Sequence, residues 1–162
     1  SFDRLYASDL RRARQTAEPL AQVLGLPIAT TPLLREIHVG ELAGLTRAEA
    51  EARFPSFLAE AAKDPWNARR HGGESMADLA RRLQAFLEEV PPGRHLVVTH
   101  GGVIRAALKL ALDLAGDTWR RFHIQNTSIT RILYPENAVL TVADAAHLEV
   151  WAGWLSGEDR EG

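Results

Sequence analysis

The residues of this chain with the clearest chemical potential are His100 and the glycine pair that follows it, Gly101 and Gly102. They follow an apolar, β-branched run at residues 96–99 and precede an apolar-periodic segment. This pattern predicts a buried strand and then a helix, so the imidazole lies at the carboxyl end of the strand, where open α/β sheets bind ligands. The N–H groups at the start of the helix favour an anion. The arrangement suits phosphate chemistry, and the alternative is a buried strand-end histidine with a glycine turn.

A cationic side chain that could meet such an anion follows another predicted strand, at residues 3–7. Ser8 has the character of a helix N-cap, which would put Arg12 in the first turn of the next helix. An arginine there can direct two N–H groups at phosphate oxygens. The alternative for this arginine-rich stretch is a solvated helix face.

A carboxylate lies in the glycine-containing loop at residues 34–44, where Glu36 stands in an otherwise apolar frame. Taken alone, Glu36 fits a surface or capping position. In the same loop His38 lies between Ile37 and Val39, and this favours a packed histidine over a pocket residue.

The irregular residues 64–74 are expected to form part of a rim over the site. Arg69, Arg70 and His71 are interpreted as exposed loop residues, with contact to a substrate as the second interpretation. Glu74 and Ser75 fit the cap of an amphipathic helix that follows.

Taken in order, these segments resemble the histidine phosphatase superfamily, also called the phosphoglycerate mutase-like family. The resemblance extends over nearly the whole chain and includes residues 126–130, which are similar to the family's segment before its closing strands. It implies phosphoryl transfer through a phosphohistidine. By resemblance, Arg12 grips the phosphate and Glu36 is the general acid and base. His100 stabilises the transferring group, with the Gly101 N–H close by.

The nucleophilic histidine of that family belongs to an N-terminal strand that ends in Arg-His-Gly, and this chain has no such strand; its Arg-His-Gly triplet at residues 70–72 lies in the irregular stretch 64–74. We therefore expect an N-terminally incomplete form of the domain, in which the first central strand is absent. The nucleophile is then expected to lie in the missing segment.

Alternating strand and helix patterns predict an α/β fold, a mostly parallel sheet with helices on both faces, in a single domain of residues 1–162. Helices are expected at residues 9–24, 46–53, 56–63, 75–90 and 103–114. Strands are expected at residues 3–7, 27–30, 96–99, 127–133 and 138–142, the last two as a hairpin.

Composition narrows the function classes. Hydrophobic residues make up 46% of the chain and the net charge is −2, which gives no indication of binding to nucleic acid or to an anionic membrane. There is no cysteine, and no His, Asp or Glu cluster has convincing metal-ligand spacing. We expect a cytoplasmic protein without a metal or cofactor. Its expected partner is a small phosphate ester, and a homodimer is left open.

The interval between Glu36 and His100 is short beside the long insertion that encloses the bisphosphoglycerate-dependent mutases of that family. The resemblance therefore implies a more open site that admits water, and hence a phosphomonoesterase. Phosphoglycerate mutase-type transfer is the alternative within the same chemistry. The alternative of another class is a catalytically inactive phosphate-binding or scaffold protein, because Arg12 and His100 alone would still bind anions.

Overall fold

The computed structural model describes residues 1–148. Its strands are β1 (Arg4–Ser8), β2 (Ile28–Thr31), β3 (His95–Val98), β4 (Ile129–Leu133) and β5 (Ala138–Asp144). Its helices are α1 (Arg11–Leu24), α2 (Arg47–Arg53), α3 (Pro55–Lys63), α4 (Met76–Glu89) and α5 (Gly101–Ala111), with short 3-10 turns between them. The predicted elements are all present, with ends shifted by a few residues.

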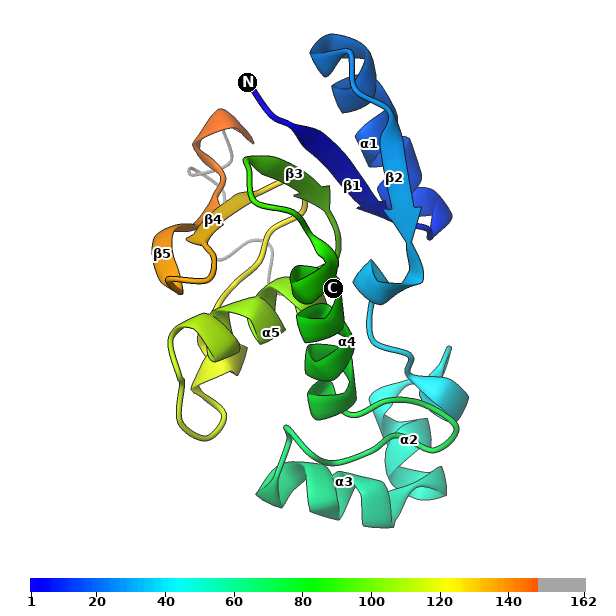
Figure 1. The fold of residues 1–162 in the computed structure, drawn as a ribbon. Coiled ribbons are helices and arrows are strands. Elements are labelled where there is room, and N and C mark those ends of the chain that lie inside the picture. Colours follow the sequence, from blue (N-terminus) through cyan, green and yellow to red (C-terminus); the bar gives the residue numbers. More distant parts are fainter. Residues whose placement is uncertain (149–162) are drawn as a thin grey trace.

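A parallel sheet forms the centre of the molecule, with the strand order β2-β1-β3 (Figure 1). Ala7 of β1 lies opposite Val98 of β3 on one side and Thr30 of β2 on the other. Because all three strands run the same way, their carboxyl ends meet at one edge. The residues that follow β1 therefore start next to the residues that follow β3.

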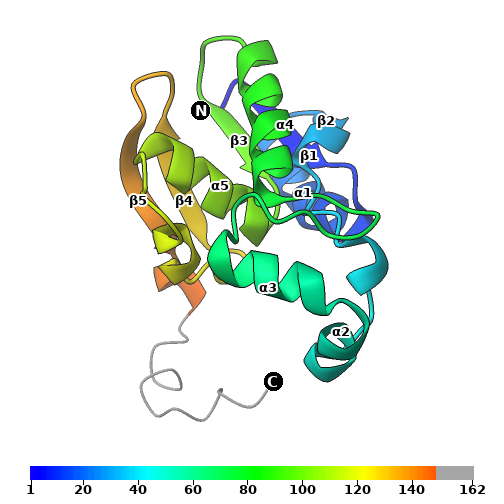
Figure 2. The same cartoon turned by 90° about the horizontal axis from the view of Figure 1, so that it is seen from below.

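Helices cover both faces of this sheet, as predicted (Figure 2). On one face the Tyr6 ring packs edge-on against Phe86 of α4, with ring centroids 5.2 Å apart. The neighbouring β1 residues Leu5 and Ala7 point to the other face, as successive residues of a strand do, and both are fully buried. Helix α1 contacts β1 and lies on that second face.

The main hydrophobic core lies between α4 and α5. The spacing of apolar residues along α4 predicts one buried face, and the structure confirms it with Leu79, Leu83 and Phe86. They pack with Val103 and Ala106 of α5. This contact fixes α4 against α5, and with it the loops that precede each helix.

Strands β4 and β5 form a separate antiparallel hairpin, as the sequence predicts. Figure 1 shows it on the β3 side of the sheet, above α5. Within residues 1–148, β3 pairs only with β1, so its second edge carries unpaired backbone groups. No helix in that described part of the chain is long and apolar enough to cross a membrane.

Two helix starts differ from the predictions. The N-cap of α1 is Leu10, which provides no side-chain hydrogen bond, so the prediction of a Ser8 cap is wrong. Arg12 nevertheless lies in the first turn, as expected. Helix α5 begins at Gly101 and not near residue 103, since His100 itself is the N-cap. Its first N–H groups therefore belong to the glycine pair.

Candidate active site

Ser8 and His100 meet at the carboxyl ends of β1 and β3. The Oγ of Ser8 lies 2.9 Å from Nε2 of His100, and both residues are buried. The same Oγ accepts a hydrogen bond from the Leu10 N–H at 3.3 Å. Ser8 therefore holds the imidazole across two neighbouring strands, which is the reason that it does not cap α1.

Charge around His100 acts mainly against its protonated form. Burial lowers the pKa of His100 below its usual value, and the guanidinium groups of Arg12 and Arg82 lower this pKa further. Glu36 is the one group that opposes them. The positive charge of Arg12 beside the imidazole favours the binding of an anion next to His100.

Arg12 is exposed and lies in the first turn of α1. Among the described residues, no acceptor binds its guanidinium, although its charge reaches His100. The structure thus brings Arg12 and His100 together, and it leaves the arginine with its donors free for a ligand.

Glu36 is turned toward the start of α5. Its Oε2 accepts a hydrogen bond from the Gly102 N–H at 3.1 Å, and its Oε1 accepts one from the Ile37 N–H at 2.9 Å. A Cβ on Gly102 would collide with Oε1, so a larger residue there would push the Glu36 carboxylate out of this position. The preceding Gly101 N–H has no acceptor within residues 1–148. The four predicted site residues therefore lie around the start of one helix.

Arg82 is a residue that the sequence interpretation missed. Its position outside the apolar face of α4 favours solvent, yet its side chain is only 17% exposed. It donates hydrogen bonds to both carboxylate oxygens of Glu74, at 2.7 and 3.0 Å, and to the backbone oxygens of Leu33 and Glu36, at 2.7 and 3.3 Å. Arg82 therefore fixes the loop that carries Glu36.

Glu74 is a second residue whose interpretation was wrong. Ser75 and Asp78 form the capping box of α4, whereas the Glu74 carboxylate binds Arg82 and the backbone N–H of His38. His38 is exposed, not packed, and its backbone carries the contact. Such long-range roles leave no periodic signal in a sequence.

The loop that carries Glu36, residues 34–44, contacts the loop at residues 64–74 at two glycines. The Glu41 N–H donates to His71 O at 2.9 Å, and the Glu74 N–H donates to His38 O at 2.8 Å. A Cβ on Gly40 would lie 2.0 Å from His71 O, and one on Gly73 would lie 2.4 Å from His38 O. The missing side chains let the loop at residues 64–74 lie directly on the Glu36 loop.

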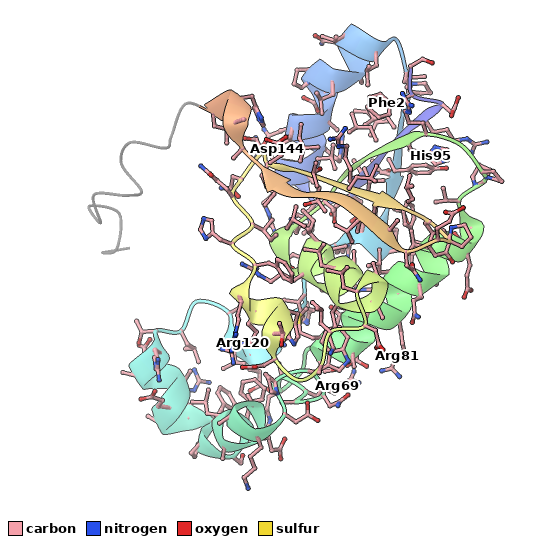
Figure 3. All side chains as sticks on the ribbon, turned by 90° about the vertical axis from the view of Figure 1, so that its left-hand side faces the viewer. Phe2, Arg69, Arg81, His95, Arg120 and Asp144 are labelled. Atoms are coloured by element: carbon pink, nitrogen blue, oxygen red, sulfur yellow. The ribbon has the colours of Figure 1, made fainter. Side chains whose placement is uncertain are left out.

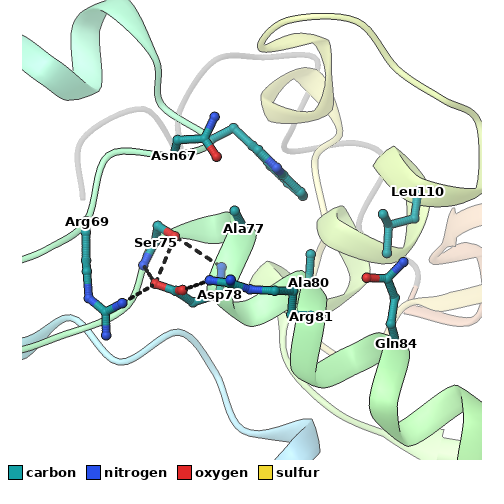
Figure 4. A pocket seen from close by; sticks show the side chains of 10 residues that line it. Asn67, Arg69, Ser75, Ala77, Asp78, Ala80, Arg81, Gln84 and Leu110 are labelled. Carbon is teal, nitrogen blue, oxygen red and sulfur yellow. Dashed lines mark hydrogen bonds and ion pairs between the residues drawn. The ribbon is translucent and has the colours of Figure 1, made fainter.

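A cavity beside α4 lies away from this site. A cavity of about 390 Å³ lies between Trp66, Leu110 and the first turns of α4 (Figure 4), and it does not include Arg12, Glu36 or His100. No group of three His, Asp or Glu residues in the described range could hold a metal ion. His95 lies at the opposite end of β3 from His100, near Phe2 (Figure 3).

Comparisons with known proteins agree with this fold. A family model described as histidine phosphatase superfamily (branch 1) matches residues 1–144. The chain is 32% identical over 157 residues to the probable phosphoglycerate mutase GpmB of Yersinia pestis (strain Pestoides F), which covers 90% of this chain and 73% of that protein.

Solved structures give the same result. The complex of a mycobacterial glucosyl-3-phosphoglycerate phosphatase with inorganic phosphate has a TM-score of 0.70 and 30% identity, covering 86% of this chain and 73% of that chain. Bacillus stearothermophilus YhfR has a TM-score of 0.78 and 26% identity, covering 92% and 77%. These neighbours confirm the predicted phosphoglycerate mutase-like α/β fold.

Proposed function

Because the chain belongs to the histidine phosphatase superfamily (branch 1), we propose that it is a phosphomonoesterase that hydrolyses a small phosphate ester through a phosphohistidine. One observation carries the proposal. The unpaired Arg12 guanidinium, the buried His100 imidazole and the Gly101 N–H lie together at the carboxyl ends of parallel strands, with Glu36 beside them.

In the first half of the reaction, a histidine nitrogen attacks phosphorus and the bond from phosphorus to the ester oxygen breaks. Negative charge on the equatorial oxygens is stabilised by donors already in place, which are Arg12, the His100 imidazole and the Gly101 N–H. Glu36, protonated at this stage, gives its proton to the leaving oxygen and the alcohol departs.

In the second half, Glu36 is the base. It removes a proton from water as the water oxygen attacks phosphorus, and the bond from phosphorus to nitrogen breaks. Inorganic phosphate forms, and Glu36 is again protonated. In the ligand-free structure each oxygen of this carboxylate accepts one backbone N–H, and these two hydrogen bonds hold Glu36 beside the start of α5.

We propose that the nucleophilic histidine comes from a segment outside these 162 residues, on a strand added beside β3. Two features support this. The second edge of β3 is unpaired within residues 1–148, and the β4–β5 hairpin forms its own sheet on that side. A strand there would end next to His100, because β3 itself leads into His100.

Mutase-type transfer is the second candidate, supported by the 32% identity to a protein named as a probable phosphoglycerate mutase. The two reactions share the phosphoenzyme and differ in whether water or an alcohol accepts the phosphoryl group. A bisphosphorylated primer should then produce transfer that outpaces hydrolysis. If the protein only hydrolyses its substrate, inorganic phosphate stays the main product when the bisphosphorylated primer is present.

The proposal is tested with the chain that includes the N-terminal segment. Reaction with a phosphate ester, followed by alkaline quench, should leave a base-stable and acid-labile phosphohistidine. Arg12→Ala and His100→Ala should each reduce the rate by about 10²-fold or more, because each removes a preorganised donor. Arg11→Ala, at the exposed neighbouring position, serves as the matched control.

Near-normal rates for both variants would refute the site. A chain that binds inorganic phosphate but forms no phosphohistidine would support the inactive binding protein instead. A phosphoenzyme formed on the 162-residue chain alone would contradict the assignment of the nucleophile to another segment.

A further inference from the structure

Three consecutive residues of the loop before α4 have different partners. Arg69 is exposed and pairs with Asp78, where it lines the cavity shown in Figure 4. The His71 ring lies against the Phe54 ring, with centroids 4.9 Å apart. Arg70, between them, is half-buried on the side of Glu36 and Glu74.

The position of Arg70 is defined by its backbone and its side chain. Its O accepts a hydrogen bond from the Gly73 N–H at 2.9 Å, and its Nη1 donates to Glu74 O at 3.0 Å. The guanidinium carbon lies 5.9 Å from the centre of the Phe57 ring, on its face. These contacts use only a small part of the five N–H groups of an arginine.

Within residues 1–148, the remaining donors of Arg70 have no protein acceptor. Among the described residues, its guanidinium makes a single hydrogen bond and no ion pair within 4.0 Å. The Glu36 and Glu74 carboxylates act on it electrostatically but do not contact it, and burial lowers the pKa of Arg70. A half-buried cation with free donors costs free energy unless an anion binds it.

We propose that Arg70 determines substrate specificity by binding a second anionic group, a carboxylate or a phosphate, on the leaving alcohol. The inference rests on the proposed function, in which Glu36 protonates the leaving oxygen. A substituent of that alcohol that reaches past Glu36 would meet Arg70, which lies near Glu74 and, unlike Arg82, makes no ion pair with it within residues 1–148. Arg12 and His100 serve the transferred phosphoryl group, so Arg70 is free for this second contact.

The test compares Arg70→Met, which keeps a flexible apolar stem against Phe57 but removes the charge, with the wild-type chain including its N-terminal segment. Three esters are used: 3-phosphoglycerate, glycerol 3-phosphate, which lacks the carboxylate, and a glycerol bisphosphate. We expect kcat/KM of Arg70→Met to fall about ten-fold or more on whichever of 3-phosphoglycerate and the glycerol bisphosphate the wild type prefers, and to fall little on glycerol 3-phosphate. The other two esters distinguish carboxylate from phosphate.

Arg69→Met is the matched control, since Arg69 is exposed and bound to Asp78. Arg70→Lys should keep part of the preference for esters with a second anionic group, because lysine keeps the positive charge but lacks the paired N–H donors of the guanidinium. An equal loss on all three esters would overturn the inference, because Arg70 would then act only through the loop or Glu36.

Calorimetric binding of the same esters separates this inference from the proposed function. If the wild type hydrolyses none of them but binds the acidic ester more tightly in an Arg70-dependent way, the function fails and the inference stands. If the wild type binds glycerol 3-phosphate as tightly as both acidic esters, the inference is overturned whatever the rates are.

Discussion

The protonation state of His100 is decided by its neighbours. Burial and two guanidinium groups oppose its positive charge, and the Ser8 hydroxyl can donate to the neutral Nε2 or accept from the protonated one. Local patterns in the sequence predicted that His100 and Gly101 follow a strand and that Arg12 lies in the first turn of a helix, as the structure has them, whereas their roles stay predictions from the family resemblance. The Ser8 contact could not be predicted, because its partner lies 92 positions away.

The stability of the protein should depend on His100 in mildly acidic solution. Its pKa is lowered on folding, so the unfolded chain takes up the proton first as the pH falls below about 6.5. The contribution of the neutral imidazole is complete above that pH and is lost toward the lower pKa of the folded state. Urea unfolding at a series of pH values should show this slope, and His100→Gln should reduce it.

His147→Gln, at an exposed histidine, provides the control for that experiment and should leave the slope nearly unchanged. The same acid slope in wild type and His100→Gln would contradict the prediction, because other groups would then account for it.

At the scale of elements, the start of α5 carries most of the candidate chemistry. Its first residues are glycines, which are poor helix formers but allow the Glu36 carboxylate to approach the backbone. The sequence predicted the helix from its apolar period, and that period begins only after the glycines. This explains why the predicted start was two residues late and why the orientation of Glu36 remained open.

Gly102→Ala should separate helix stability from activity. Alanine favours the helix by about 0.5–1 kcal/mol, but its Cβ would displace the Glu36 carboxylate, which lies 2.1 Å away. We expect an unchanged circular dichroism spectrum and a loss of about 10²-fold in kcat. Gly101→Ala should lose less, since its Cβ would meet the flexible end of Arg105 at 3.3 Å and Ile124 at an ordinary van der Waals distance of 3.8 Å. Equal activity of Gly102→Ala and wild type would exclude Glu36 as the proton donor.

At the scale of the whole molecule, the site is assembled from segments far apart in the chain. The order β2-β1-β3 pairs β1 with a strand about ninety residues later, and no local pattern specifies that neighbour. Alternation of strands and helices predicted the fold class, but not which loops meet. Arg82 connects residues 33, 36 and 74, and this is a property of the assembled molecule alone.

Arg82→Met should therefore destabilise the protein by about 2–3 kcal/mol, because it removes a hydrogen-bond donor from two backbone oxygens and leaves the Glu74 carboxylate with the His38 N–H alone among residues 1–148. Arg81→Met is the matched control. Arg81 is 70% exposed and pairs with Asp78, so its loss should cost less than about 1 kcal/mol. Chemical denaturation measures both values, and similar values for the two variants would contradict the role of Arg82.

In the loop before α4, a substitution at Arg69 and an insertion after Arg70 should have different evolutionary effects. Its end is fixed by hydrogen bonds from Gly73 to Arg70 and from Glu41 to His71, whereas Arg69 binds a separate partner, Asp78. Substitutions at Arg69 can therefore accumulate as neutral drift on the outer surface. A one-residue insertion between Arg70 and Gly73 would instead bring a new side chain into the position of Arg70. Descendants of this chain could thus change substrate by altering loop length while every residue of the phosphate site is inherited intact.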